Sequence, residues 1–112
     1  MSAGTGPQDL TLEAAWAMLE NDENAVLIDV RTQAEWGFVG TPDLTALGRE
    51  PRLVEWTRYP GGTRNDSFLV EASAGLTADQ PVLLLCRSGA RSAAAAHALS
   101  DAGFTTTYNV VA

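Results

Sequence analysis

One stretch decides the fold of this chain: Pro81-Val82-Leu83-Leu84-Leu85-Cys86-Arg87-Ser88-Gly89-Ala90-Arg91-Ser92. Residues 81–85 form a short apolar run, which is typical of a strand buried on both faces of a parallel sheet. Residues 92–102 are rich in alanine and are followed by Gly103, a pattern that predicts a helix with a glycine just past its end. The order of strand, loop and helix places Cys86 at the carboxyl end of the strand, directly before the helix.

Cys86 is the only cysteine of the chain, and its position favours a reactive thiolate. The loop offers backbone N–H groups, the helix adds the positive end of its dipole, and Arg87 and Arg91 add two guanidiniums. All three favour the thiolate, which is the nucleophilic form of cysteine. In this setting the alternative, an inert buried cysteine, is disfavoured. The pattern therefore predicts an enzyme with a cysteine nucleophile that acts on a small anionic substrate.

Composition narrows the class of protein further. The length of 112 residues fits one domain over residues 1–112, and the small polar stretch 1–9 predicts a flexible N-terminus. Fourteen carboxylates stand against seven arginines, with no lysine, so neither nucleic acid nor an anionic membrane is an expected partner. A single cysteine excludes an internal disulfide and a cysteine-rich metal site, and we expect no metal and no cofactor. With no apparent signal peptide or membrane-length apolar run, a cytoplasmic location is expected.

The remaining elements alternate between helix and strand. We expect helices over 11–20, with Thr11 as the N-cap, over 32–38, and from a cap at Asn65 or Asp66 to about residue 74. We expect strands over 25–30, 53–56 and 105–111, of which the strand over 53–56 is the weakest candidate. Such alternation predicts parallel β-α-β units in an α/β fold, in which ligands bind at the carboxyl ends of strands. Cys86 occupies a position of that kind.

At this point the residues resemble a known family, the rhodanese-like sulfurtransferases. The resemblance rests on the Cys86–Ser92 loop, on Asp29-Val30-Arg31 closing an early strand, on Glu35-Trp36 after it, and on the stretch from Gly103-Phe104 to Tyr108-Asn109-Val110. It extends over nearly the whole chain, and the mid-chain stretch looks most like a single-domain bacterial subgroup. The resemblance implies an open parallel sheet with helices on both faces.

The resemblance also implies a reaction and roles for the site residues. Cys86 would attack the outer sulfur of thiosulfate or a related donor, and the persulfide would pass sulfur to cyanide or a thiol. The active loop would hold the negative sulfur through its backbone N–H groups, and comprises Arg87, Ser88, Gly89, Ala90, Arg91 and Ser92. Asp29 and Arg31 would brace this loop, or form an internal ion pair without a chemical role.

Individual loop residues leave alternatives open. Arg87 either meets the sulfonate end of the donor or is simply exposed to solvent. Arg91 either points back into the loop or pairs with a carboxylate beneath it. Ser88 and Ser92 have hydroxyl groups that can donate to bound sulfur, but we expect Ser92 to cap the helix instead.

The length of the loop separates the competing activities. Four residues lie between Cys86 and Arg91, one fewer than in the tyrosine-phosphatase signature. A narrower ring suits a single sulfur atom better than a phosphoryl group, so a phosphatase or arsenate reductase is disfavoured. A second alternative is a carrier that receives sulfur from a partner protein and has little activity on free thiosulfate.

Other residues carry weaker expectations. Arg49, Arg52, Arg58 and Arg64 are expected on a solvated surface, His97 on the surface or at a helix contact, and Trp36 with Phe38 in one wall of the pocket. The stretch 37–43 departs from the commoner family pattern, which alters a wall near the site. The chain also ends soon after the last expected strand, where the family usually continues with a glycine-rich turn and a short final segment.

Overall fold

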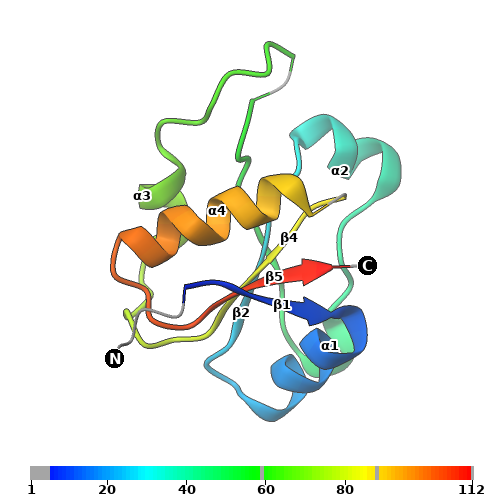
Figure 1. Ribbon diagram of the computed structural model, residues 1–112. Coiled ribbons are helices and arrows are strands. Elements are labelled where there is room, and N and C mark those ends of the chain that lie inside the picture. The colour runs from blue at the N-terminus through cyan, green and yellow to red at the C-terminus, as the bar shows by residue number, and fades with distance from the viewer. Residues whose placement is uncertain (1–5, 59, 88, 112) are drawn as a thin grey trace.

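The computed structural model describes residues 6–58, 60–87 and 89–111, and is built on a five-stranded sheet. Its strands are β1 (Gln8–Thr11), β2 (Val26–Asp29), β3 (Arg52–Leu53), β4 (Val82–Leu85) and β5 (Thr107–Val111). They lie in the order β1-β5-β4-β2-β3, and each pair of neighbours is parallel; Figure 1 labels β1, β5, β4 and β2. All carboxyl ends therefore point to one edge of the sheet, where β4 ends at Leu85.

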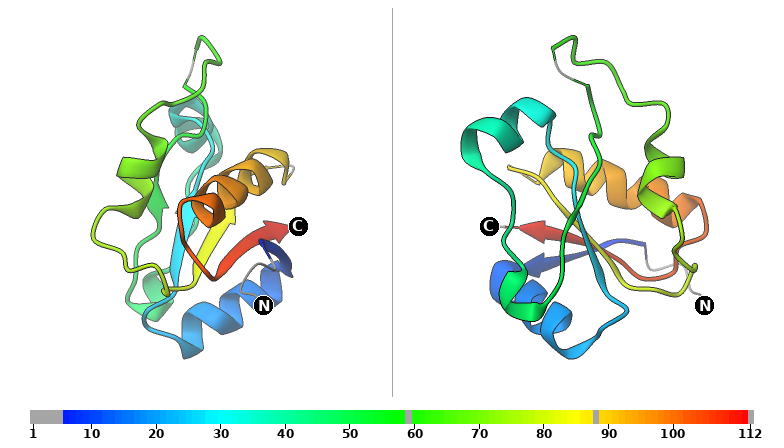
Figure 2. Two further views of the ribbon diagram at one scale, coloured as in Figure 1. Left: turned by 60° about the vertical axis from the view of Figure 1, so that its left-hand side comes forward. Right: turned by 180° about the vertical axis from the view of Figure 1, so that it is seen from behind.

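Helices cover both faces of this sheet. They are α1 (Leu12–Asn21), α2 (Gln33–Val39), α3 (Phe68–Ser73) and α4 (Ala90–Asp101), with a 3-10 turn, η1 (Thr45–Leu47). One face packs against α3 and α4 and the other against α1, whereas α2 lies beyond the carboxyl end of β2 (Figure 2). No helix in the described part of the chain combines the length and apolar character needed to cross a membrane. The α/β fold expected from the sequence is confirmed.

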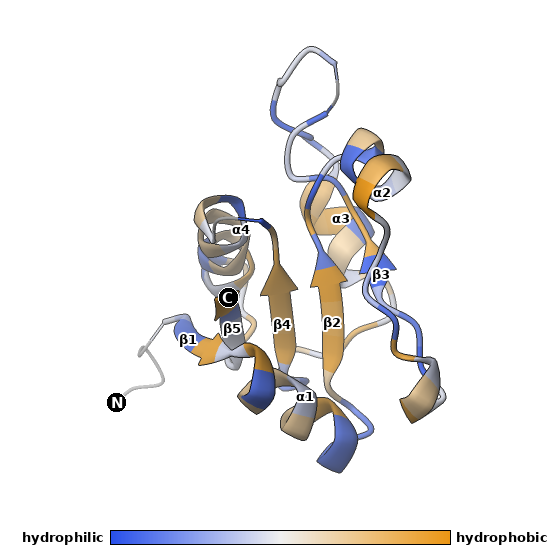
Figure 3. Cartoon of the chain, turned by 90° about the vertical axis from the view of Figure 1, so that its right-hand side faces the viewer, coloured by the Kyte–Doolittle hydropathy of each residue, from blue (hydrophilic) through white to orange (hydrophobic). Residues whose placement is uncertain are grey.

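The two central strands, β2 and β4, explain the apolar runs in the sequence. Successive residues of a strand point to opposite faces. Ile28 and Leu84 pack toward α3 and α4, while Leu27 and Leu83 pack toward α1. Because both faces are covered, residues 26–28 of β2 and 82–85 of β4 are apolar at every position rather than at alternate positions (Figure 3).

Polar caps set two of the helix starts. The Thr11 side chain accepts a hydrogen bond from the Ala14 N–H at 3.1 Å, as expected for the N-cap of α1. Thr32 and Glu35 form a capping box at the start of α2. In contrast, α4 begins at Ala90 with Gly89 as its N-cap, two residues before the predicted start.

Three other boundaries predicted from the sequence were also wrong. Residues Gln8 and Asp9, expected in a flexible N-terminus, belong to β1 and pair with Tyr108 and Asn109 of β5; residues 1–5 lie outside the described part. The strand expected over 53–56 is only the two-residue β3, although Val54 and Trp56 still donate backbone hydrogen bonds to the carbonyl oxygens of Asp29 and Val30. The cap of α3 is Ser67 rather than Asn65 or Asp66.

Candidate active site

Cys86 follows β4 directly, at the carboxyl edge of the sheet. Its thiol is buried, with only 6% of the residue exposed. The sulfur accepts hydrogen bonds from the backbone N–H groups of Gly89 at 3.1 Å and Ser92 at 3.4 Å. Gly89 has a φ of +91°, a backbone conformation that favours glycine and turns its N–H group toward the sulfur. The loop therefore forms the cradle of N–H groups expected from its sequence.

Two opposing effects set the pKa of the Cys86 thiol. Burial raises the pKa, whereas the hydrogen-bonding contact with the Ser92 hydroxyl and the hydrogen bonds from the backbone N–H groups of Ser92 and Gly89 lower it. The hydrogen bonds outweigh burial, so the pKa of Cys86 lies below its usual value. The sequence pattern pointed to the same direction, but the lowering comes chiefly from short-range donors rather than from free guanidiniums.

Ser92 does not cap the helix as predicted. It lies within the first turn of α4, fully buried, and its Oγ is 3.3 Å from the Cys86 sulfur. The same hydroxyl contacts the Oδ1 atom of Asn109 at 2.5 Å and the carbonyl oxygen of Gly89 at 3.2 Å. Asn109 lies on β5 and was not identified as a site residue from the sequence. The sequence feature that could have identified Asn109 is its polar side chain within a stretch predicted to be a buried strand.

Asp29 and Arg31 form an ion pair at the end of β2. Arg31 donates to both carboxylate oxygens of Asp29, with the shortest distance 2.6 Å, and to the carbonyl oxygen of Gly40 at 2.7 Å. Asp29 is completely buried and accepts no N–H group of the Cys86 loop among the described contacts. The structure therefore shows the internal ion pair between Asp29 and Arg31. The pair fixes the end of β2 against Gly40, which lines the pocket at Cys86.

Arg91 pairs with a carboxylate rather than pointing into the loop. Its two terminal nitrogens donate to the two carboxylate oxygens of Glu35 at 2.6 and 2.9 Å. The guanidinium holds the pKa of Glu35 at about 2, mainly by this hydrogen bonding and against the effect of burial. The pair joins α4 to α2 across the site, between residues 56 positions apart in sequence.

A hollow of about 440 Å³ opens onto the thiol. Its walls come from the ends of β2 and β4 and from the segment after α2, and consist of Arg31, Glu35, Val39, Gly40, Thr41, Pro42, Leu85, Cys86 and Arg87. Arg87 is exposed at this hollow and makes no ion pair within the described residues. Ala90, the first residue of α4, is exposed, and Ser88 lies outside the described residues.

The pocket wall differs from the expected one. Neither Trp36 nor Phe38 lines the hollow, and Phe38 is 92% exposed. The stretch Val39–Pro42 takes their place, because α2 ends at Val39 and the chain then turns past Cys86. This stretch is also where the sequence departs from the commoner family pattern.

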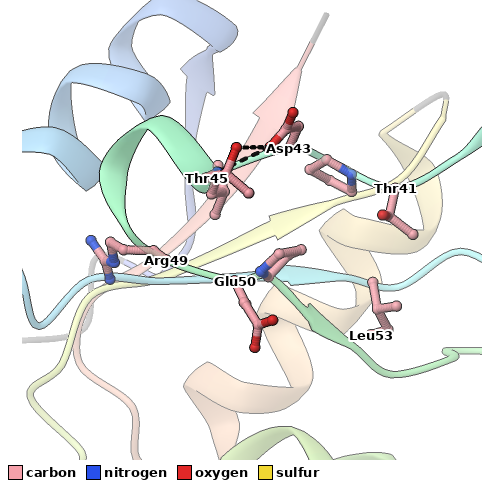
Figure 4. A pocket seen from close by; sticks show the side chains of 9 residues that line it. Thr41, Asp43, Thr45, Arg49, Glu50 and Leu53 are labelled. Carbon is pink, nitrogen blue, oxygen red and sulfur yellow. Dashed lines mark hydrogen bonds between the residues drawn. The ribbon is translucent and has the colours of Figure 1, made fainter.

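A second hollow of about 600 Å³ adjoins the first and shares Thr41 and Pro42 with it (Figure 4). Its polar groups are largely committed to local structure. Asp43 accepts hydrogen bonds from the backbone and hydroxyl of Thr45. Arg49 donates to backbone carbonyl groups, among them those of Leu19 and Ala25. This hollow contains no cysteine, histidine or serine, so we place the candidate site at Cys86.

Of the four mid-chain arginines, Arg58 and Arg64 are exposed as expected, whereas Arg49 and Arg52 are not. Arg49 and Arg52 are partly buried and donate to main-chain carbonyl groups; Arg58 binds Asn65, and Arg64 lies over the Trp56 ring. None of the four lines the hollow at Cys86. His97 is exposed on α4, as expected. Within the described residues, no group of three or more His, Cys, Asp or Glu side chains is placed to hold a metal ion.

Comparison with known proteins extends these observations. A model of the rhodanese-like domain family matches residues 11–111. The crystal structure of Rv0390 from M. tuberculosis is 48% identical, with a TM-score of 0.86 over 96% of this chain and 79% of that one. The solution structure of the polysulfide-sulfur transferase homodimer from Wolinella succinogenes is 28% identical, with a TM-score of 0.68 over 96% of this chain and 70% of that one.

A curated relative agrees with this assignment. The uncharacterized protein RP600 of Rickettsia prowazekii is 33% identical over 103 residues, which are 92% of this chain and 80% of the relative. The family match contains both segments on which the resemblance rested, Asp29-Val30-Arg31 and the loop from Cys86 to Ser92. The chain therefore belongs to the rhodanese-like domain family.

Proposed function

We propose that the protein is a rhodanese-type sulfurtransferase that moves a sulfur atom from thiosulfate or a related donor to cyanide or a thiol, through a persulfide on Cys86. The observation that carries this proposal is the geometry of the thiol. Its sulfur lies at the floor of an open hollow and accepts two backbone N–H groups. Membership of the rhodanese-like family and likeness to a polysulfide-sulfur transferase support sulfur transfer.

The reaction consists of two displacements at sulfur. The Cys86 thiolate attacks the outer sulfur of thiosulfate; a new S–S bond forms, the old one breaks, and sulfite leaves with the electron pair. Cyanide then attacks the outer sulfur of the persulfide, a C–S bond forms, and the electron pair of the broken S–S bond returns to Cys86 as a thiolate. Thiocyanate leaves, and neither an electron nor a proton is required from outside.

Two features of the hollow fit these steps. The N–H groups around Cys86 can stabilise the negative charge of bound sulfur without adding a charged side chain to the site. Arg87, exposed and without an ion pair in the described residues, is placed to meet the sulfonate end of the donor. Arg31 also lines the hollow, but it is already bound to Asp29.

Intact-mass spectrometry tests the proposal directly. The purified protein is incubated with thiosulfate, separated from it and then treated with cyanide. We expect the mass to rise by one sulfur atom and to return to its starting value, with no gain in a folded Cys86→Ser variant. An unchanged mass of the folded wild-type protein would contradict loading from thiosulfate.

A second candidate function is a sulfur carrier that is loaded by a partner protein. The exposed apolar residues Phe38 (92%) and Val39 (72%) favour this function, because Val39 lines the hollow at Cys86 and both lie on α2. A mass gain with a persulfide-bearing desulfurase, but not with thiosulfate, would identify the carrier. Cys86-dependent hydrolysis of an aryl phosphate would instead favour a phosphatase. For either sulfur-transfer function we propose a cytoplasmic setting, with no nucleic-acid or membrane partner.

A further inference from the structure

The Ser92 hydroxyl has one proton and three neighbours that can accept it. The sulfur of Cys86 is 3.3 Å away, the carbonyl oxygen of Gly89 is 3.2 Å away, and Oδ1 of Asn109 is 2.5 Å away. Ser92 is fully buried, and Asn109 is 7% exposed. Because this region is so poorly exposed, the direction of the Ser92 O–H bond decides which neighbour is satisfied.

The surroundings of Asn109 fix the orientation of its amide. Its Nδ2 group faces the carbonyl oxygen of Gly89 at 3.2 Å and a carboxylate oxygen of Asp9 at 3.4 Å. Both are acceptors, so the NH₂ group must point toward them and the amide oxygen must point toward Ser92. An amide oxygen has no proton to offer, and the short contact therefore takes the proton of the Ser92 hydroxyl.

We propose that Asn109 is a positioning residue that competes with the Cys86 sulfur for the single proton of the Ser92 hydroxyl and so disfavours the free thiolate. In the thiol state, the Cys86 S–H group donates to the Ser92 oxygen, and every group is satisfied. In the thiolate state, a lone pair of Ser92 faces the negative sulfur, or the hydroxyl turns to the sulfur and leaves the Asn109 oxygen without its donor.

The persulfide state avoids this conflict. In a persulfide the negative charge lies mainly on the outer sulfur, so the Cys86 sulfur no longer requires a donor from Ser92. Asn109 thus disfavours the thiolate state of Cys86 and does not disfavour the thiol or the persulfide state. This part of the inference rests on the proposed sulfurtransferase function, whereas the effect of Asn109 on the thiol does not.

The consequence for sulfur transfer follows from thiol chemistry. A thiolate of higher pKa is a stronger nucleophile and a poorer leaving group, with rates scaling by a Brønsted coefficient of about 0.4–0.5. Asn109 would therefore make each Cys86 thiolate faster at taking sulfur and slower at giving it up. The pair formed by Ser92 and Asn109 would favour a persulfide that persists until an acceptor arrives.

The charged groups around Cys86 do not change when Asn109 is replaced by a neutral residue. Arg91 is bound to Glu35 and Arg31 to Asp29, while Arg87 lies at the mouth of the hollow. Asp9 lies on the far side of the Asn109 amide and is exposed. A change in the pKa of Cys86 when Asn109 is replaced therefore arises from the direction of the Ser92 hydroxyl rather than from the loss of a charge.

The test is a double-mutant cycle read by the alkylation of Cys86. Iodoacetamide reacts with the thiolate, and its rate against pH gives the pKa of Cys86 without any sulfur transfer. We expect Asn109→Leu to lower this pKa by about one pH unit, a tenfold change of the order expected for one redirected hydrogen bond. In a Ser92→Ala background, which has no hydroxyl to redirect, we expect Asn109→Leu to leave the pKa unchanged.

The outcomes separate a positioning role from a packing role. The inference is overturned if Asn109→Leu lowers the pKa of Cys86 equally in both backgrounds. It is also overturned if this substitution leaves the pKa unchanged, or raises it, in the protein that retains Ser92. Asn109→Ala provides the same comparison if the leucine variant does not fold. A persulfide-loaded Asn109→Leu protein should also release sulfur to cyanide about threefold faster than the wild type. If even the wild type takes up no sulfur, the proposed function fails while the alkylation result still stands.

Discussion

Two loops leave neighbouring parallel strands at the same edge of the sheet, and they are built in different ways. The loop after β4 surrounds the Cys86 sulfur with backbone N–H groups from Gly89 and Ser92. The segment after β2 is held instead by side-chain ion pairs, Arg31 with Asp29 and Arg91 with Glu35. The comparison shows that backbone donors contact the candidate nucleophile, while paired charges hold the elements around it.

This difference predicts different sensitivities. Backbone N–H groups do not titrate, and their direction depends on the φ and ψ angles of the loop, so a change of conformation should disturb the sulfur most. Ion pairs depend on pH and salt, and partly exposed pairs contribute modestly to stability. Substitutions in the two loops should therefore affect activity and stability in different proportions.

The largest effect is expected for Gly89→Ala. A Cβ atom there would meet only ordinary contacts, 3.7 Å from Asn109 and 3.8 Å from Val111, so the main cost arises from the positive φ. We expect a loss of about 1–2 kcal/mol in the free energy of unfolding. Misplacing one N–H donor should slow persulfide formation about a hundredfold.

The matched control for this change is Gly103→Ala, at the other end of α4. Gly103 has a φ of +111°, and a Cβ there would meet open space. Chemical denaturation should show a similar loss of stability in both variants, and thiosulfate loading should slow in Gly89→Ala alone. Equal loading rates in the two variants would mean that the N–H groups of the loop do not act on sulfur.

An intermediate effect is expected for Arg87→Ala. Because Arg87 is exposed at the hollow and has no ion pair within the described residues, its removal should leave the stability nearly unchanged. We expect kcat/KM for thiosulfate to fall about tenfold, the equivalent of about 1.4 kcal/mol, through a higher KM. Arg64→Ala removes the same charge away from the hollow and should not change the kinetics. Equal losses in both variants would assign the effect to net charge.

The smallest effect is expected for Glu35→Gln. Arg91 holds the pKa of Glu35 at about 2, below its usual value of 4.5. A lowered pKa in the folded state adds stability above pH 4.5, and this stability is lost as the pH falls from 4.5 toward 2. Solvent screening at this partly exposed pair limits the contribution to about 1 kcal/mol or less.

Denaturant titrations of both proteins at several pH values measure this contribution. The wild type should lose its advantage over Glu35→Gln across that acidic range, while the two proteins keep similar loading rates at neutral pH. A constant difference at all pH values would show that packing, rather than charge, links α2 to α4.

The sequence predicted those parts of the fold that depend on neighbouring residues. The apolar runs ending at Asp29 and Leu85 indicated buried strands, and the threonine at position 11 indicated a helix start. β1 was missed because Gln8–Thr11 is polar and short, and its strand conformation depends on pairing with β5, about a hundred residues later. The local sequence pattern of residues 8–11 gives no information about pairing with so distant a strand.

The residues of the site could likewise be predicted only where they are close together in the sequence. Cys86 and its loop were evident, because the strand, loop and helix signals are contiguous. Glu35 as the partner of Arg91 and Asn109 as the partner of Ser92 depend on which elements the fold brings together. Ser92 was expected to cap α4, but the sequence did not show that Gly89 takes the cap position instead.

The strand order has a consequence for biosynthesis. β1 leaves the ribosome well before β5, the strand with which it pairs. Asn109 lies on β5, so the surroundings of the Cys86 sulfur remain incomplete until β5 has emerged. At about 5–20 residues per second, the chain spends about a second or more with Cys86 made but β5 absent. During translation the protection of this thiol from oxidation depends on the reducing power of its surroundings rather than on the fold of the protein.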